Sequence, residues 1–408
     1  MEAIILLVFL FVYFGMFLGE IPGLQIDRAG IALVGAIVLV MTDVLTPEHA
    51  WNAIDVSTIA LLFGLMVISS QFRLGGFYTA VTKTLSSVQA SPEHLLLLLI
   101  LASAILSAFL ANDIVCLAMT PILIEGCIRR GLNPIPYALA LACSSNVGSA
   151  LTLIGNPQNM LIGQQLQLHF SGYLLDSCLP VILSLLLTWW IIRYLFKDQW
   201  YADLPFHEVA APEFNAWQSF KGCVILLLLI LIFLFTGIPR ESAALAGAAI
   251  LLMSRKLTSR EMLSLVDWQL LVLFMGLFVV NSAVFNTGRL EQGVQALSEM
   301  GMDLHQPFWL FIITVLLSNL VSNVPAVMLL IPFADHPYAG SILALSSTLA
   351  GNLILVGSIA NLIVVDRARE LGILIDWKQH ARVGIPVTLA TLLITALWLW
   401  LRIQLFPN

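Results

Sequence analysis

The chain has 408 residues, of which 60% are apolar and only 10% are charged, and its mean hydropathy is +0.96. Soluble domains carry about 25% charged residues, so this composition excludes a soluble enzyme and a disordered chain. The net charge of −6 offers no basic surface for nucleic acid. The remaining class is an all-α polytopic membrane protein.

Apolar runs that can form membrane elements recur along the whole chain. A helix that spans the membrane needs a run of roughly 20 residues. They lie near residues 3–19, 29–43, 56–72, 95–128, 135–165, 173–196, 221–237, 242–254, 268–286, 307–333, 338–365 and 383–403. The polar stretch 197–220 is too short for a domain. We interpret it as a linker between two halves.

The two halves are related by an internal repeat. Residues 26–76 align without a gap onto residues 238–288, so that Asp55 meets Asp267 and Gly64 meets Gly276. Shared apolar composition does not place Asp, Gly and Pro in one order over so long a stretch.

Two later motifs repeat as well. LANDIVCLAMTP (110–121) matches VSNVPAVMLLIP (321–332), and GNPQN (155–159) matches GSIAN (357–361). We therefore infer a duplication, with a first repeat over residues 1–196 and a second over residues 221–408.

Loop charges predict that the second repeat is inverted. Loop 42–55 holds no Lys or Arg, whereas the equivalent loop 254–267 holds Arg255, Lys256 and Arg260. Because cytoplasmic loops are enriched in Lys and Arg, the two loops should lie on opposite sides of the membrane. Each half then has about five transmembrane helices plus a re-entrant hairpin and a broken helix. The linker would be cytoplasmic and both termini would lie outside.

The helical patterns are interrupted twice in each half. The first repeat contains a predicted hairpin at 95–128 and a broken helix at 135–165, and the second contains a hairpin at 307–333 and a broken helix at 338–365. Non-helical backbone at membrane depth is tolerated only inside protein or beside water. Inverted repeats with interrupted helices are typical of secondary transporters. The four breaks therefore predict one central cavity, although both legs of each hairpin could instead cross the membrane fully.

Asp113 is the most informative single residue, because a carboxylate at the bilayer centre costs roughly 2.5–3.5 kcal/mol. One interpretation is a protonation site or a ligand of the coupling ion. The alternative is a carboxylate that caps its own helix. Its counterpart in the second repeat is Val324, so the two hairpin tips differ chemically.

The remaining candidate residues are neutral and cluster in the broken helices and at the tips. Gly allows the backbone to unwind, and Asn, Ser and Thr supply neutral donors and acceptors, although small-residue helix packing uses Gly and Ser in the same way. The predicted substrate or ion site comprises Asn112, Asp113, Asn146, Gly148, Ser149, Thr152, Gly155, Asn156, Asn159, Ser322, Asn323, Gly351, Asn352, Gly357, Ser358 and Asn361. A Na⁺ ion could be bound by Asn112, Asp113, Asn146 and Asn323.

The motifs LANDIVCLAMTPI, SNVGSALTLIGNPQN, SNVPAVMLLIPF and AGNLILVGSIANLIV resemble those of the ion transporter superfamily. This group includes arsenite-pump membrane subunits, NhaD-type Na⁺/H⁺ antiporters, citrate carriers and dicarboxylate/sulfate symporters. The resemblance covers about residues 20–400. Dicarboxylate symporters tend to carry Ser-Asn-Thr at both tips, whereas Ala111-Asn112-Asp113 looks more like the arsenite-pump branch.

The resemblance implies a multi-pass permease of a bacterial inner membrane that moves a small anion or oxyacid of the carboxylate, sulfate or arsenite class. It implies coupling to H⁺ or Na⁺ without a cofactor, and a homodimer as the candidate assembly. The alternatives are a Na⁺/H⁺ antiporter using Asp113 and the membrane subunit of an ATP-driven arsenite pump. Because the chain has no nucleotide-binding motif of the G-x-x-x-x-G-K-[ST] type, that pump would need a separate ATPase. No motif of an intramembrane enzyme is present, so we do not expect catalysis.

Overall fold

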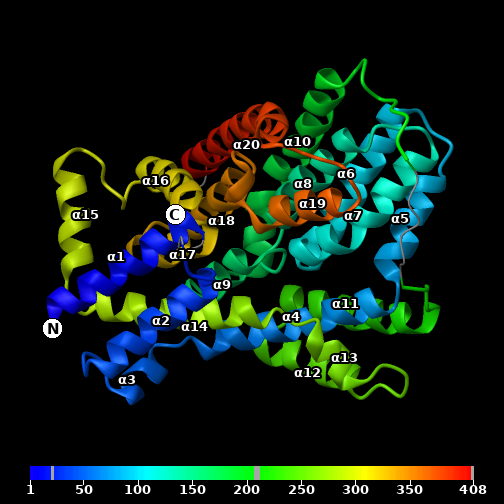
Figure 1. Cartoon of the computed structure of the whole chain (residues 1–408). Helices are drawn as coiled ribbons and strands as arrows, with labels where there is room; N and C mark the ends of the chain where they lie inside the picture. Colours follow the sequence, from blue (N-terminus) through cyan, green and yellow to red (C-terminus); the bar gives the residue numbers. More distant parts are fainter. Residues whose placement is uncertain (20–22, 206–211, 406–408) are drawn as a thin grey trace.

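The computed structural model describes residues 1–19, 23–205 and 212–405, which form an all-helical, two-layered molecule (Figure 1). The first half contains α1 (Glu2–Leu18), α2 (Arg28–Met41), α3 (Pro47–Asn52), α4 (Val56–Leu74), α5 (Phe77–Ser87), α6 (Pro92–Phe109), α7 (Asn112–Arg129), α8 (Pro134–Ser149), α9 (Pro157–Gln165) and α10 (Phe170–Leu195). The second half contains α11 (Ala216–Phe235), α12 (Arg240–Leu252), α13 (Ser259–Ser264), α14 (Trp268–Phe285), α15 (Arg289–Glu299), α16 (Pro307–Val321), α17 (Asn323–Leu330), α18 (Ala339–Ala350), α19 (Ile359–Glu370) and α20 (Trp377–Leu405).

The lengths and composition of these helices fit a polytopic membrane protein. Within the described residues, six helices are long and apolar enough to cross a membrane, namely α4, α6, α10, α11, α14 and α20. Several of the shorter helices, including α1, α2, α16 and α18, are also apolar. The predicted fold class is confirmed.

Each helix of the first half has a counterpart in the second half in the same order. The short helices α3 and α13 both begin after a capping threonine, Thr46 and Thr258. Helices α5 and α15 both begin after a glycine with positive φ, 66° at Gly76 and 67° at Gly288. A side chain at either position would be strained, which explains why the repeat alignment places these two glycines on each other.

The two halves interlock through equivalent pairs of helices. Helix α2 packs on α14 and α4 packs on α12, and exchanging the halves turns one pair into the other. A Cβ atom on Gly64 would lie 2.8 Å from the backbone of Ala244, and one on Gly276 would lie 2.7 Å from the backbone of Ala32. Small residues let the helix backbones approach closely here.

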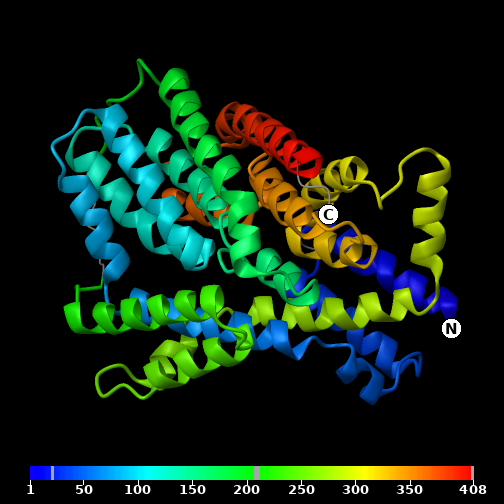
Figure 2. The ribbon, with the colours of Figure 1, turned by 180° about the vertical axis from the view of Figure 1, so that it is seen from behind.

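The halves run in opposite directions. Helix α4 leads into α5 at one end of the molecule, whereas α14 leads into α15 at the other end (Figures 1 and 2). Helices α1, α2, α4, α11, α12 and α14 form one layer, and the hairpins and broken helices form the other.

The interruptions have defined boundaries. The legs α6 and α7 meet at Leu110-Ala111, and α16 and α17 meet at Ser322. The first broken helix is unwound between α8 and α9, where Pro157 starts α9 and the Asn156 side chain accepts a hydrogen bond from the amide of Asn159. The second is unwound between α18 and α19.

Two boundaries differ from the sequence-based expectation. The linker predicted over 197–220 ends earlier, because the Asn215 side chain caps α11 and residues 216–220 are helical; residues 206–211 lie outside the described residues. The second broken helix continues beyond residue 365, because α19 extends to Glu370.

Candidate functional site

The hairpin tips and the broken helices meet at a central cavity of about 40 Å³. Six of the predicted site residues line it, namely Asn112, Asp113, Asn146, Ser322, Asn323 and Ser358. Sequence reasoning missed five further lining residues, which are Pro157, Gln158, Leu270, Val324 and Ile359. The motif GNPQN contains Pro157 and Gln158 and therefore carried the signal for those two.

Asn146 of α8 is the hub of the polar groups around the central cavity. Its Oδ1 accepts hydrogen bonds from Nδ2 of Asn112 (3.1 Å) and Oγ of Ser358 (2.9 Å). Its Nδ2 donates to Oδ1 of Asn352 (2.8 Å) and Oδ1 of Asn361 (3.2 Å). One buried amide thus joins the first hairpin tip to the broken helix of the second repeat.

A second group of predicted residues supports this hub without lining the cavity. Asn156 donates from Nδ2 to Oγ of Ser149 (2.9 Å) and to Oγ1 of Thr348 (3.2 Å). Gln158, one of the unpredicted lining residues, also donates to Thr348 (3.2 Å). Asn159 donates to the carbonyl of Thr152 (3.0 Å). Thr348 was not predicted, although it stands at the repeat position equivalent to Asn146.

The remaining predicted residues in the first repeat and Gly357 allow close backbone packing or bond to backbone carbonyls. A Cβ atom on Gly148 would lie 2.3 Å from Ala104 of α6, so this glycine permits close helix packing. Gly155 and Gly357 approach the carbonyl oxygens of Ser149 and Gly351 in the two unwound segments. The Thr152 hydroxyl donates to the carbonyl of Ala108.

Several buried oxygens around the site have no hydrogen-bond donor within the described residues. They are Oδ1 of Asn112, Oδ1 of Asn323 and Oδ1 of Asn319. A buried polar group without a partner costs about 1–3 kcal/mol. These carbonyl oxygens can therefore be satisfied by a ligand that brings hydroxyl groups or a cation.

Asp113 lies in the first turn of α7 and lines the central cavity. No side chain caps α7, because the N-cap residue is Ala111. The capping interpretation of this carboxylate is therefore not realised. In the part of the chain that is described, the carboxylate has no ion-pair partner.

A larger side cavity of about 200 Å³ adjoins the central one, and both are lined by Asp113, Pro157 and Leu270. The side cavity lies between the two layers, among α4, α7, α9, α14 and α19, and Arg73 and Asp267 stand at its wall. Asp267 caps its helix, with Oδ1 accepting from the amide of Leu270 (2.9 Å).

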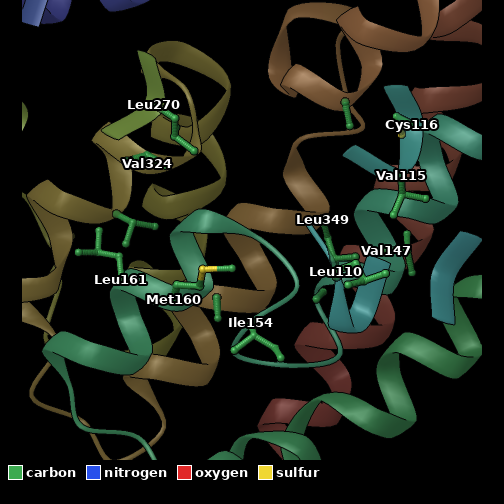
Figure 3. Close-up of a cluster of buried hydrophobic side chains, with 14 of the residues drawn as sticks. Leu110, Val115, Cys116, Val147, Ile154, Met160, Leu161, Leu270, Val324 and Leu349 are labelled. Carbon is green, nitrogen blue, oxygen red and sulfur yellow. The ribbon is translucent and has the colours of Figure 1, made fainter. Parts of the chain in front are cut away.

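Apolar side chains enclose the polar groups. Leu110, Val147 and Leu349 cluster beside the first hairpin tip, and Leu270 lies near Val324 at the second (Figure 3). Among the described residues, no Lys, Arg or His lines the central cavity. Nor does that part of the chain contain a group of three or more His, Cys, Asp or Glu side chains suited to a transition metal. The site can therefore hold a hydroxyl-rich solute or an alkali cation through neutral oxygens.

Known proteins place this architecture among transporters. An uncharacterized transporter of Mycobacterium tuberculosis is 31% identical, with 94% of this chain and 95% of that protein aligned. The silicon efflux transporter of rice is 28% identical over 93% of each chain. The putative transporter arsB of Dictyostelium discoideum is 25% identical over 91% of this chain and 87% of its own.

A solved structure shares the fold. The YdaH transporter of Alcanivorax borkumensis, described as having an unusual topology, superposes with a TM-score of 0.57 at 14% identity, covering 99% of this chain and 98% of its own. The family model described as citrate transporter (CitMHS) matches residues 4–343. The chain is therefore a multi-pass membrane transporter that belongs to the citrate transporter family.

Proposed function

We propose that this protein is a secondary active transporter that moves a small anion or oxyacid across the bacterial inner membrane, coupled to H⁺ or Na⁺. The observation that carries the proposal is the central cavity, which Asn112, Asp113 and Asn323 line together; Oδ1 of both asparagines has no hydrogen-bond partner among the described residues. Within the carboxylate, sulfate and arsenite classes, we favour a neutral oxyacid with several hydroxyl groups.

The chemistry of the lining favours hydroxyl donors over a bare anion. A carboxylate or sulfate needs cationic side chains or many N–H donors, whereas the described lining of the central cavity has no cationic side chain. Arsenite and silicic acid are uncharged near neutral pH and carry hydroxyl groups that can donate to carbonyl oxygens. The silicon named for the rice relative agrees with this choice.

The cavity size points the same way. A cavity needs at least about 10–15 Å³ of accessible space to hold one water molecule, so a volume of about 40 Å³ suits an ion or a small solute with a few hydroxyl groups. A citrate ion would have to extend into the side cavity. We propose that Asp113 holds the proton or helps to bind Na⁺, with Asn112, Asn146 and Asn323 as neighbours.

Currents from purified protein in liposomes test the proposal, with arsenite, silicic acid, citrate, sulfate and Na⁺ offered with and without a pH gradient. We expect a current with one oxyacid, and its loss in Asp113→Asn protein. Asp43→Asn is the matched control, because Asp43 is exposed and lies in the loop after α2, where φ of 54° suits Asn equally well.

Other outcomes assign the alternatives. Transport of Na⁺ against protons without any oxyacid would make the protein an antiporter. Oxyacid transport only when an ATPase and ATP are added would make it the membrane subunit of a pump. Enzymatic turnover of a solute would contradict a transporter role altogether.

The proposed orientation has its own test. All but three of the 18 Lys and Arg residues fall on the cytoplasmic side when both termini are placed outside. A periplasmic reporter joined after Asn408 should be active, and a cytoplasmic reporter at the same place should be silent. The reverse result would invert the assignment.

A further inference from the structure

The structure is not symmetric at its two ends, although the repeats are. At one end, the C-terminal end of α9 is docked on the opposite layer. The Gln165 amide donates to the Asp55 carboxylate, and Arg240 Nη2 donates to the carbonyl of Gly163 (2.7 Å). Gln164 also donates to Glu241 (2.9 Å). This end is closed by contacts between α9, α4 and α12.

The repeat alignment identifies the equivalent residues at the other end. Asp55 corresponds to Asp267, and Arg240 corresponds to Arg28. The match of 155–159 with 357–361 continues along α9 and α19 without a gap. It places Gln165 on Arg367 and Gly163 on Val365, and the hydrogen bonds support it. Asn159 donates to the carbonyls of Ser149 and Thr152, and Asn361 donates to the equivalent carbonyls of Gly351 and Ile354.

None of the closing contacts is made at this second end. Within the described residues, the Asp267 side chain accepts only the amide of Leu270. Arg367 is paired with Glu370 on its own helix (2.7 Å). In the part of the chain that the structure describes, Arg28 has a buried Nε without a partner. The side cavity lies here instead, between Asp267 of α14 and Ile363 of α19.

We propose that Asp267 and Arg367 form an ion pair that closes this end when the Asp55–Gln165 end opens, and that Arg28 then donates to the carbonyl of Val365. The proposal rests on the transporter function, since a carrier must expose its site to each side in turn. Exchanging the conformations of the two repeats converts the contacts of Gln165 with Asp55 and of Arg240 with Gly163 into their equivalents at the other end. The contact of Gln164 with Glu241 has no equivalent there, because Ala29 stands at the position that corresponds to Glu241.

The two closures differ in chemistry. Gln165 offers one neutral donor to Asp55, whereas Arg367 offers a charged and bidentate one to Asp267. Before the Asp267–Arg367 ion pair can form, the ion pair between Arg367 and Glu370 must break. Asp267 and Arg367 are therefore assigned to the conformational change itself, in addition to the helix cap that Asp267 provides.

Paired cysteines test the assignment in membranes, without any transported solute. The background replaces Cys178 and Cys223 by Ser, because Cys116, Cys127 and Cys143 are buried. Asp55→Cys with Gln165→Cys should cross-link readily with a short bis-thiol reagent. Asp267→Cys with Arg367→Cys should cross-link more slowly, from the alternate state. A protein with all four cysteines should form either bond but never both in one molecule.

The control pair is Asp267→Cys with Arg369→Cys, which removes the same charges but uses a residue two positions along α19. A 267–367 yield no higher than the 267–369 yield would overturn the proposal, as would both bonds in a single molecule. Because this readout needs no transport, it distinguishes failure of the gate from failure of the proposed function.

A charge exchange gives a second, independent test once a transported solute is known. Asp267→Arg and Arg367→Asp should each slow transport about tenfold, within the usual range of conformational coupling. The double exchange should recover to within about threefold of the parent protein. Single variants that transport at the parent rate would contradict the ion pair. A double variant that transports no faster than the single variants would contradict it as well.

Discussion

The two hairpin tips occupy equivalent places in the repeats but are built differently. At the first tip, Asn112 is bonded to Asn146 and its amide approaches the carbonyl of Gly155 (3.4 Å). At the second tip, Ser322 adopts φ of 77° and ψ of 159°, a conformation otherwise nearly confined to glycine, and Oδ1 of Asn323 has no partner among the described residues. One tip carries a carboxyl group and is held by hydrogen bonds, and the other carries no titratable side chain and has a strained backbone. The duplicated halves thus share one architecture, but only the first tip carries a carboxyl group.

The largest expected effect comes from moving the carboxylate between the tips. Asp113→Asn should lower ion-coupled transport about 100-fold, as loss of a proton-transfer group does. Asp113→Val combined with Val324→Asp should recover less than a tenth of the parent rate, because residue 113 reaches both cavities and residue 324 reaches only the central one. Liposome currents measure both. Full recovery would show that the tips are interchangeable.

The next effect concerns the hub and its counterpart. Asn146→Ala removes three hydrogen bonds between the repeats and one to the first hairpin tip, and it should lower the free energy of unfolding by about 3 kcal/mol. Thr348→Val should cost about 1 kcal/mol, because its hydrogen bonds measure 3.2–3.3 Å. Denaturation in detergent compares the two variants. Equal losses of unfolding free energy in the two variants would mean that Asn146 of the first repeat contributes no more than Thr348 of the second.

Backbone strain gives a smaller effect of opposite sign at the two tips. Ser322→Gly should raise the unfolding free energy by about 1 kcal/mol, because glycine adopts this backbone conformation without strain. Ala111→Gly should lower it by about 0.5 kcal/mol, because Ala111 has an ordinary φ of −53° and glycine only adds freedom to the unfolded chain. Thermal unfolding of the two proteins measures the difference. A loss of stability in both would remove the claim of strain.

The smallest effect compares the caps of α3 and α13. The Thr258 side chain caps α13, and the Glu261 carboxylate in turn accepts hydrogen bonds from the Thr258 amide and hydroxyl. These hydrogen bonds hold the pKa of Glu261 below its usual value. Its contribution is therefore complete above the unfolded-state pKa of about 4.3 and is lost as the pH falls through the lower, folded-state pKa.

Protection of the α13 amides, measured relative to the intrinsic exchange rate at each pH, should fall over that acidic range in the parent protein, whereas in Glu261→Gln protein this protection should change little. Helix α3, where His49 takes the equivalent place beside Thr46, serves as the internal control. A parent protein whose α13 exchange is insensitive to acid would contradict the assignment.

Much of this fold could be predicted from the sequence, because long apolar runs and an internal repeat can be recognised without knowing how the segments pack. The Asp, Gly and Pro positions that match between halves also indicated the hairpins and the unwound segments. The clustering of Asn112, Asn146 and Asn323 around one cavity could be anticipated from the motifs that contain them.

The directions of individual side chains could not be predicted. The sequence does not reveal that Gly148 faces Ala104 across a helix interface, nor that Asn146 reaches Asn361 in the other half. Both depend on how two distant segments cross. The role of Leu270 in both cavities likewise requires the packing of α14 against the broken helices.

The interlocking of α2 with α14 and of α4 with α12 has a consequence for how the protein arose and is made. Because exchanging the halves exchanges these interfaces, they match the two-fold contacts of a dimer. A half-length ancestor with this packing must have inserted into the membrane in both orientations and paired with its own inverted copy. In the present chain, the first half emerges from the ribosome without the partner for α2 and α4. Its packing is therefore completed only when α12 and α14 have been synthesised, and the halves expressed separately should accumulate only together.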